Sequence, residues 1–214
     1  MEIVYLDQEI VVCLKPAGLL STDEPGGVPE ALREQLHIEE VRTVHRLDRV
    51  VGGLMLLARS AEAASALSRQ IREGSFDKRY LAVGHGETPD SGELHDLLAR
   101  DKAERKTYVV SQPGKGVQEA ALRYETLARR DGRSLVRIEL LTGRTHQIRC
   151  QFSSRGYPLV GDRKYSLRQD DCGIALWSQQ LSFRHPADGR PLRFTAAPPA
   201  LTPWTVFHEL FNNF

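Results

Sequence analysis

The residue best suited to do chemistry in this 214-residue chain is Asp48. It lies in VHRLDRVVGGL (residues 44–54), between Arg46 and Arg49, after an extended run of apolar and polar residues and before a glycine pair. A carboxylate beside guanidinium groups stays ionised, and an ionised Asp can act as a nucleophile or a base. An ordinary ion pair would have the same residues, so this segment alone leaves both readings open.

Two further segments carry candidate residues. In LLTGRTHQIR (residues 140–149) a strand ends, the chain turns, and a helix begins with Arg144 at its N-terminus. Free amides and the helix dipole favour an anion there. An ordinary helix capped by Thr142 or Thr145 would have the same sequence pattern. In FDKRYLAV (residues 76–83) Tyr80 sits in a strand beside two bases, where core packing is the alternative.

The familiar cofactor and metal motifs are missing from the sequence. It has no GxSxG, no GxxxxGK[ST] and no GxGxxG, and its seven histidines and three cysteines lack ligand spacing. We therefore expect side chains alone to carry any chemistry, with no metal and no cofactor. The start of the chain shows no signal-peptide pattern, and no apolar run approaches the ~20 residues of a membrane span, which predicts a soluble, cytoplasmic protein.

Strand patterns dominate the elements that must position these residues. A hairpin is predicted from residues 2–6 and 10–15, and Asp131-Gly132 indicates a second hairpin turn. The remaining predicted strands cover residues 53–58, 78–84, 106–110, 120–127, 133–141, 177–183 and 192–195. Helices are predicted at residues 28–36, 60–73 (with Ser60 as N-cap), 145–155 and 203–214. Without regular βαβ alternation, this pattern favours an α+β fold on a mixed or antiparallel sheet, within one domain.

Charge is distributed unevenly along the chain. The net charge is +1, but residues 1–43 carry nine acids and three bases, a net of −6, and the remaining residues a net of +7. Of the 29 basic residues 23 are Arg, whose planar fork suits phosphates and bases. The basic part of the chain indicates an anionic partner, with RNA or DNA as the first candidates.

Taken in order, these motifs resemble the RluA-type family of RNA pseudouridine synthases. The family's KPxG, HRLD, KxY and LxTGRxHQIR patterns match KPAG (residues 15–18), HRLD (45–48), KRY (78–80) and LLTGRTHQIR (140–149). GD at residues 161–162 and LSFRHP at 181–186 match later patterns of the family. The agreement covers almost the whole chain.

The resemblance implies an α+β catalytic domain with a mixed, largely antiparallel central sheet, flanking helices and an RNA-binding active-site cleft. It implies conversion of uridine to pseudouridine in rRNA or tRNA, by cleaving the glycosidic bond and joining C5 of the flipped-out uracil to C1′. Asp48 would be the catalytic aspartate, Tyr80 would pack against the uracil, and Arg144 would pair with the carboxylate. The residues expected to bind the RNA substrate are His45, Arg46, Arg49, Lys78, Thr145, His146, Gln147 and Arg149.

The sequence also departs from the family. VVGG (residues 50–53) stands where many members have a polar residue followed by Thr-Ser-Gly, which bears on the choice of target site. KPxG already begins at residue 15, so we expect residues 1–214 to form a single catalytic domain, a monomer without an N-terminal RNA-binding module. Two rival functions are a non-catalytic RNA-binding or ribosome-assembly factor and a glycosidase or nucleosidase. The latter needs a second carboxylate, which none of the matched catalytic motifs supplies.

Overall fold

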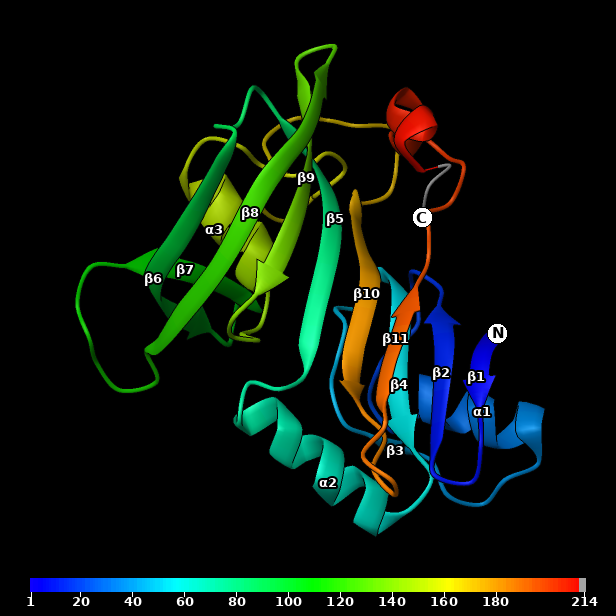
Figure 1. Cartoon of the computed structure of the whole chain (residues 1–214). Helices are drawn as coiled ribbons and strands as arrows, with labels where there is room; N and C mark the ends of the chain where they lie inside the picture. The colour runs from blue at the N-terminus through cyan, green and yellow to red at the C-terminus, as the bar shows by residue number, and fades with distance from the viewer. Residues whose placement is uncertain (212–214) are drawn as a thin grey trace. The chain divides into compact units, whose positions relative to one another are not determined.

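The computed structural model describes residues 1–211, which form two compact units. The first consists of Met1–Lys78 and Trp177–Ala197, and the second of Arg79–Leu176 and residues 198–211. Figure 1 labels the helices and strands of both units. Each unit has its own sheet strands and at least one helix.

The strands of the first unit lie in the order β1, β2, β4, β10, with β11 paired to β10 and β3 to β4 (Figure 1). Their bounds are Glu2–Leu6 for β1, Ile10–Lys15 for β2, Arg42–Thr43 for β3, Gly52–Ala58 for β4, Leu176–Arg184 for β10 and Pro191–Thr195 for β11. All of these pairs are antiparallel except β4 with β10, which is parallel. The predicted N-terminal hairpin and the mixed sheet are therefore confirmed.

Two helices belong to the first unit. Helix α1 (Val28–Leu36) begins with a proline in its first turn, where the missing N–H costs nothing, and ends at His37 in the left-handed conformation. Helix α2 (Ala61–Arg72) begins as predicted, because the Ser60 hydroxyl accepts a hydrogen bond from Ala63 N at 3.0 Å. Both helices thus have the ends that their sequences indicate.

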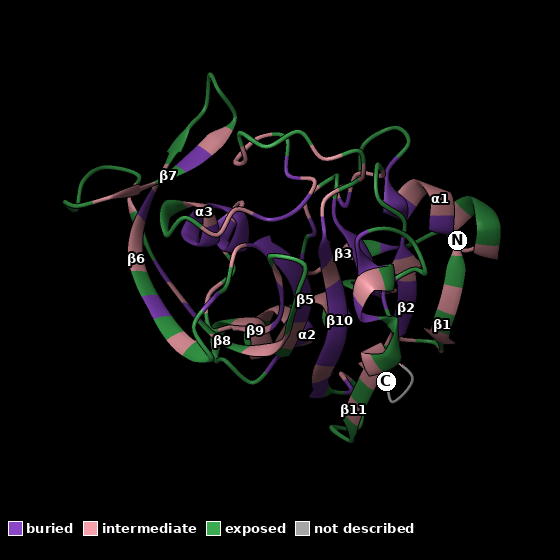
Figure 2. Cartoon of the chain, turned by 90° about the horizontal axis from the view of Figure 1, so that it is seen from above, coloured by how far each residue is buried: buried purple, intermediate pink, exposed green. Residues whose placement is uncertain are grey.

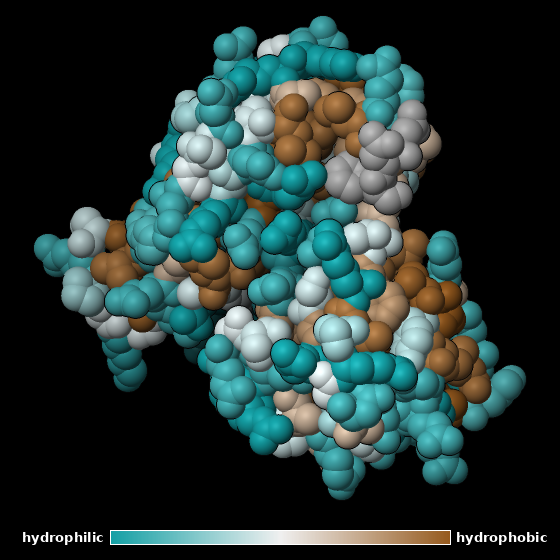
Figure 3. Space-filling view, in the orientation of Figure 1, coloured by the Kyte–Doolittle hydropathy of each residue, from teal (hydrophilic) through white to brown (hydrophobic). Residues whose placement is uncertain are grey.

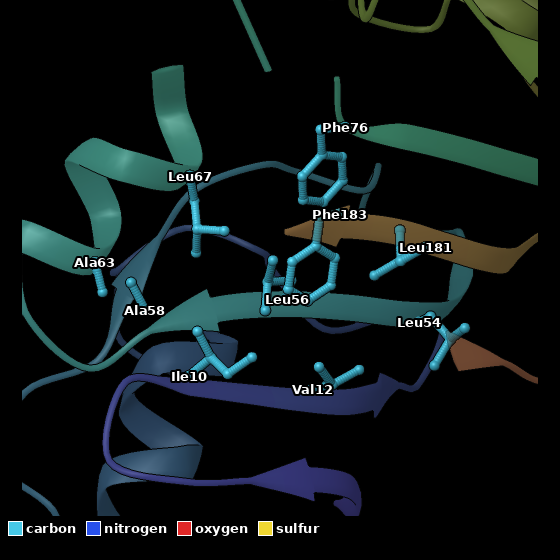
Figure 4. Packing of buried hydrophobic residues seen from close by; sticks show 10 residues of the cluster. All are labelled: Ile10, Val12, Leu54, Leu56, Ala58, Ala63, Leu67, Phe76, Leu181 and Phe183. Atoms are coloured by element: carbon cyan, nitrogen blue, oxygen red, sulfur yellow. The ribbon is translucent and has the colours of Figure 1, made fainter. Parts of the chain in front are cut away.

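The core of the first unit lies where α2 covers the strands. Leu67 of α2 packs with Ile10, Leu56, Phe76 and Phe183, and Figure 4 shows these side chains pointing toward one another. Phe76 and Phe183 stack with ring centroids 5.4 Å apart. This packing holds β4, and with it the end of the loop that carries Asp48.

The second unit is an antiparallel sheet in the order β5, β9, β8, β6, β7. The bounds are Asp77–His85 for β5, which starts at the end of the first unit, Ser91–Asp101 for β6, Lys106–Val110 for β7, Gln118–Arg130 for β8 and Arg133–Leu140 for β9. Asp131 and Gly132 join β8 to β9 with φ values of 52° and 66°, the positive pair that a two-residue hairpin turn requires. Helix α3 (Gln147–Ser154) packs on this sheet, with Cys150 against Leu98 and Ala120.

Several elements differ from the sequence predictions, among them the two-residue strand β3, which the sequence does not predict. The sequence pattern does not predict strand β6, because its two buried leucines, Leu94 and Leu98, recur at the i, i+4 spacing of a helix face. Helix α3 has His146 as its N-cap residue, with φ of 55°, and no side chain caps the helix, so the predicted threonine cap is wrong. The C-terminal segment is a 3₁₀ helix (Trp204–Phe211) interrupted at Phe207, and residues 212–214 of the predicted helix lie outside the described residues.

Burial differs from one strand to another. In Figure 2 β10 is almost entirely buried, whereas β6 alternates between buried and exposed residues. Hydrophilic residues cover most of the face drawn in Figure 3. Within residues 1–211, no helix is long and apolar enough to cross a membrane.

Candidate active site

Asp48 lies half-buried in the loop between β3 and β4 of the first unit. Its neighbour Leu47 is buried, and the Ser21 hydroxyl both donates to Leu47 O at 2.8 Å and accepts from Leu47 N at 3.0 Å. A turn follows, in which Val51 N donates to Asp48 O at 3.0 Å. Because the residues on both sides are anchored, the backbone at Asp48 is held in place while Arg46 and Arg49 remain exposed.

Lys15 supports this loop from inside the unit. Its side chain is fully buried, and the ammonium donates to Pro16 O at 2.9 Å, Leu19 O at 2.8 Å and Arg49 O at 3.2 Å. Burial lowers the pKa of Lys15 to about 8, although the nearby charge of Asp48 acts in the opposite direction. The KPAG segment therefore supports the loop of residues 44–51, which carries Asp48 and is called the aspartate loop below.

A second connection joins the same two segments. Gly18 N donates to Arg49 O at 2.7 Å, and Arg49 Nε donates back to Gly18 O at 2.8 Å. Lys15 and Ser21 are absent from the residues proposed from the sequence. The KPxG motif was the available signal for Lys15, but a lysine that braces a loop cannot be told from an exposed one by sequence alone.

His45 does not lie where an RNA contact would be made. The side chain is buried, Nε2 accepts a hydrogen bond from Leu56 N at 3.0 Å, and the ring packs on Phe76 with centroids 5.6 Å apart. Burial, and to a lesser extent the charge of Lys78, lowers the pKa of His45 to about 3. A neutral, enclosed imidazole positions the start of the loop, so the sequence-based assignment of His45 to RNA binding is not supported.

The glycine pair after the loop has a specific structural reason. A Cβ on Gly52 would lie 2.7 Å from the Trp177 ring, and one on Gly53 would lie 2.4 Å from Ser178 O. Gly53 also has φ of 116°. The two glycines allow β4 and β10 to run side by side at the point where the loop enters the sheet.

Tyr80 is a buried residue of β5, opposite Ile138 of β9 in the second unit. Two residues earlier Lys78 is half-buried, with its ammonium 5.9 Å from the centre of the Phe76 ring. Burial lowers the pKa of Lys78. Strand pairing thus fixes the backbone of Tyr80 within the sheet, and its role against the uracil stays a prediction.

Arg144 lies half-buried in the turn between β9 and α3. The turn is built around the buried side chain of Gln147, whose Oε1 accepts from Thr142 Oγ1 at 2.8 Å and from Arg144 N at 2.9 Å. The amide of Gln147 also donates to Ala121 O at 3.0 Å, and Arg144 Nε donates to Glu119 O at 2.9 Å. Gln147 therefore shapes the turn that presents Arg144 rather than contacting RNA itself.

Arg149 also has a structural role. It forms a two-point ion pair with Asp162, at 2.8 Å for both hydrogen bonds, and its side chain is 6% exposed against 0% for the carboxylate. The guanidinium lies 5.1 Å from the centre of the Tyr165 ring, and the Tyr165 hydroxyl lies 2.9 Å from Nδ1 of His146. Of the predicted RNA-binding residues in this motif, Thr145 and His146 are half-buried, whereas Arg149 is enclosed.

The residues proposed for catalysis are divided between the two units. Asp48 belongs to the first unit, and Tyr80 and Arg144 belong to the second. The pairing of Arg144 with Asp48 stays a prediction. Across residues 1–211, no three His, Cys, Asp or Glu side chains are grouped so that they could hold a metal ion.

Comparison with known proteins supports one family. The model of the RNA pseudouridylate synthase family matches residues 9–154. An uncharacterized RNA pseudouridine synthase, YlyB of Bacillus subtilis, is 33% identical over 213 residues, covering 93% of this chain and 69% of the relative. The dual-specificity RNA pseudouridine synthase RluA of Yersinia pestis is 34% identical, covering 91% of this chain and 97% of its own. The chain spans only 58% of tRNA pseudouridine synthase C of Pectobacterium carotovorum, at 33% identity over 92% of this chain.

Solved structures show the same fold. Human RNA pseudouridylate synthase domain containing 1 has a TM-score of 0.80 at 25% identity, covering 94% of this chain and 84% of that one. Human RNA pseudouridylate synthase domain containing 4 has a TM-score of 0.77 at 24% identity, covering 92% and 88%. The α+β fold, the aspartate loop and the matched sequences lead to one conclusion: the chain belongs to the RNA pseudouridylate synthase family.

Proposed function

We propose that this chain converts uridine to pseudouridine in a ribosomal or transfer RNA, with Asp48 as the carboxylate that acts at C1′. The main support for this proposal is that the loop with Asp48 is anchored on both sides by hydrogen bonds. Asp48 is half-buried between two exposed arginines, on backbone fastened by Lys15 and Ser21. A reacting carboxylate needs this kind of support, because small displacements of a reacting group are costly in rate.

The reaction needs only side-chain chemistry. The N1–C1′ bond of uridine breaks, the uracil turns, and a C5–C1′ bond forms, while C5 loses a proton and N1 gains one. Atoms and electrons balance without an oxidant or a cofactor. An ionised carboxylate beside C1′ serves this sequence either by forming a bond to carbon or by removing a proton.

The other residues take supporting roles in the proposal. Tyr80 packs against the uracil, and Arg144 pairs with Asp48 and keeps it charged. Arg46 holds the flipped-out nucleotide or fills the place that it left. Extruding a base costs a few kcal/mol and is least costly in loops, which favours a uridine in a loop as the target.

The substrate class rests on the relatives and on charge. RluA of Yersinia pestis is described as dual-specificity, and other relatives are named for tRNA or for the large ribosomal subunit. Residues 44–214 of this chain carry a net charge of +7, which suits a polyanionic partner. Exposed or half-buried Arg49, Lys78, Thr145 and His146 are the proposed RNA contacts besides Arg46. We further propose that residues 1–214 work as one catalytic domain, as a cytoplasmic monomer without a metal.

Tritium release from RNA labelled at uracil C5 tests the activity. The wild type should release tritium, whereas Asp48→Asn should release none above background and still bind RNA, because the change is nearly isosteric. Asp171→Asn, at an exposed position, is the matched control and should turn over like the wild type. Turnover by Asp48→Asn at the wild-type rate would remove this residue from the mechanism. No release by the wild type from any RNA, with RNA binding retained, would point instead to a non-catalytic RNA-binding role.

A further inference from the structure

The second unit has an open, polar surface pocket of about 500 Å³, called the cavity below, that the proposed mechanism does not use. Three segments line it: the end of β5 with His85, the turn into β9 with Arg133, and residues 168–170 with Arg168 and Asp170. The volume lies within the range of small-molecule sites. All of these residues belong to the same unit, so the cavity is complete within it.

The cavity is separate from the residues proposed for catalysis. Tyr80 and His85 are five residues apart in β5, so their side chains lie on opposite faces of the strand and about 17 Å apart along it. Arg144 follows the end of β9 that pairs with the start of β5, whereas the cavity lies at the opposite end of this pair. A ligand in the cavity is therefore not the uridine that reacts beside Tyr80.

Asp170 connects His85 to residue Gly161 on one side of the cavity. Its Oδ2 accepts from Gly161 N at 2.8 Å and lies 2.9 Å from Nε2 of His85. Burial by itself would raise the pKa of Asp170, but these hydrogen bonds and the charges of His85 and Arg133 together lower it. An ionised carboxylate only accepts, so Nε2 of His85 carries the proton and Nδ1 is the ring nitrogen left for a ligand.

Two arginines of the lining, Arg133 and Arg168, differ from most other arginines of the chain. Most arginines with side-chain partners in this chain face a carboxylate, as Arg123 faces Glu93 at 3.0 Å. Arg133 and Arg168 line the cavity, and within residues 1–211 their guanidinium groups make no hydrogen bond or ion pair. The lining thus contains two arginines and a histidine but only two carboxylates. One of the carboxylates, Asp170, already accepts from Gly161 N and contacts Nε2 of His85.

We propose that this cavity binds the phosphate group of a nucleotide. The planar forks of Arg133 and Arg168 provide charged donors of the geometry that phosphate oxygens accept, and His85 Nδ1 provides a third donor when the ring is protonated. The cavity is larger than a phosphate ion, so the attached sugar also fits. A free mononucleotide and a phosphodiester of bound RNA share this chemistry.

Binding of small phosphates tests the site without the isomerase reaction. Uridine 5′-monophosphate, orthophosphate and uridine are titrated into the full chain, and the ring resonances of His85 are followed by NMR. The two phosphates should shift them and uridine should not. Arg133→Gln/Arg168→Gln should weaken the monophosphate at least about tenfold, the size expected for lost charge-assisted hydrogen bonds. The control Arg100→Gln/Lys102→Gln removes the same charge at exposed positions and should bind like the wild type.

The source of the phosphate is decided by RNA affinity measured against salt. If RNA supplies it, the arginine double variant loses affinity and the slope of log K against log salt falls by about two, whereas a free nucleotide leaves the slope unchanged. The proposal is overturned if neither phosphate moves the His85 resonances at millimolar concentration. It is equally overturned if the double variant and the control bind the monophosphate alike. Tritium release tests the isomerase separately, so the two proposals can fail independently.

Discussion

Replacing Lys15 with methionine should change the stability of the protein in a way that depends on pH. The ammonium is fully buried and donates to three carbonyl oxygens, and burial lowers its pKa from 10.5 to about 8. The unfolded chain therefore binds more protons than the folded chain between these two values. In that window, the stability of the wild type rises with pH relative to a variant that lacks the group.

The magnitude follows from the two pKa values. Holding the charged lysine in the fold costs about 3 kcal/mol at pH 7, and this cost falls by about 1 kcal/mol at pH 9 and by more at pH 10. In Lys15→Met, however, three carbonyl groups lose their hydrogen-bond donor. Each loss destabilises the fold by about 1–3 kcal/mol. The variant should therefore be less stable than the wild type at pH 7, and the difference should grow by about 1 kcal/mol at pH 9.

Urea unfolding of both proteins at pH 7, 8 and 9 measures this difference. Lys102→Met is the control, because Lys102 is exposed, and its difference from the wild type should not change over the same range. A difference for Lys15→Met that is constant or shrinks with pH would refute the reasoning. Tritium release should also fall in Lys15→Met, since the loop that holds Asp48 loses its brace.

Three further substitutions test the packing around the site. Arg149→Met leaves the enclosed Asp162 carboxylate without its partner and should destabilise the fold by about 3–5 kcal/mol, seen in urea unfolding. Ser60→Ala removes a helix cap and should lower stability by about 1 kcal/mol without changing tritium release. Gly53→Ala introduces a Cβ 2.4 Å from Ser178 O at a positive φ and should cost at least about 2 kcal/mol, measured as a lower thermal midpoint. Wild-type stability in any of these variants would contradict the packing described.

Local sequence patterns predicted most of the elements. The hairpin of β1 and β2, the helices α1 and α2, and the turn at Asp131-Gly132 each depend on residues close together in the chain, and all are confirmed. The sequence missed β6 because a strand with only two buried residues, Leu94 and Leu98, gains its stability from its partners β7 and β8. Pairing with distant residues leaves little trace in a local pattern.

The sequence by itself determined the family and the order of its motifs, because the residue types around Asp48, Tyr80 and Arg144 are local properties. Only the tertiary structure decided which neighbours in those motifs are enclosed. His45 and Arg149 are buried although their residue types suggest RNA contacts, and the fully buried Lys15 supports the aspartate loop. Burial is set by what the rest of the fold places around a side chain, and no local pattern carries that information.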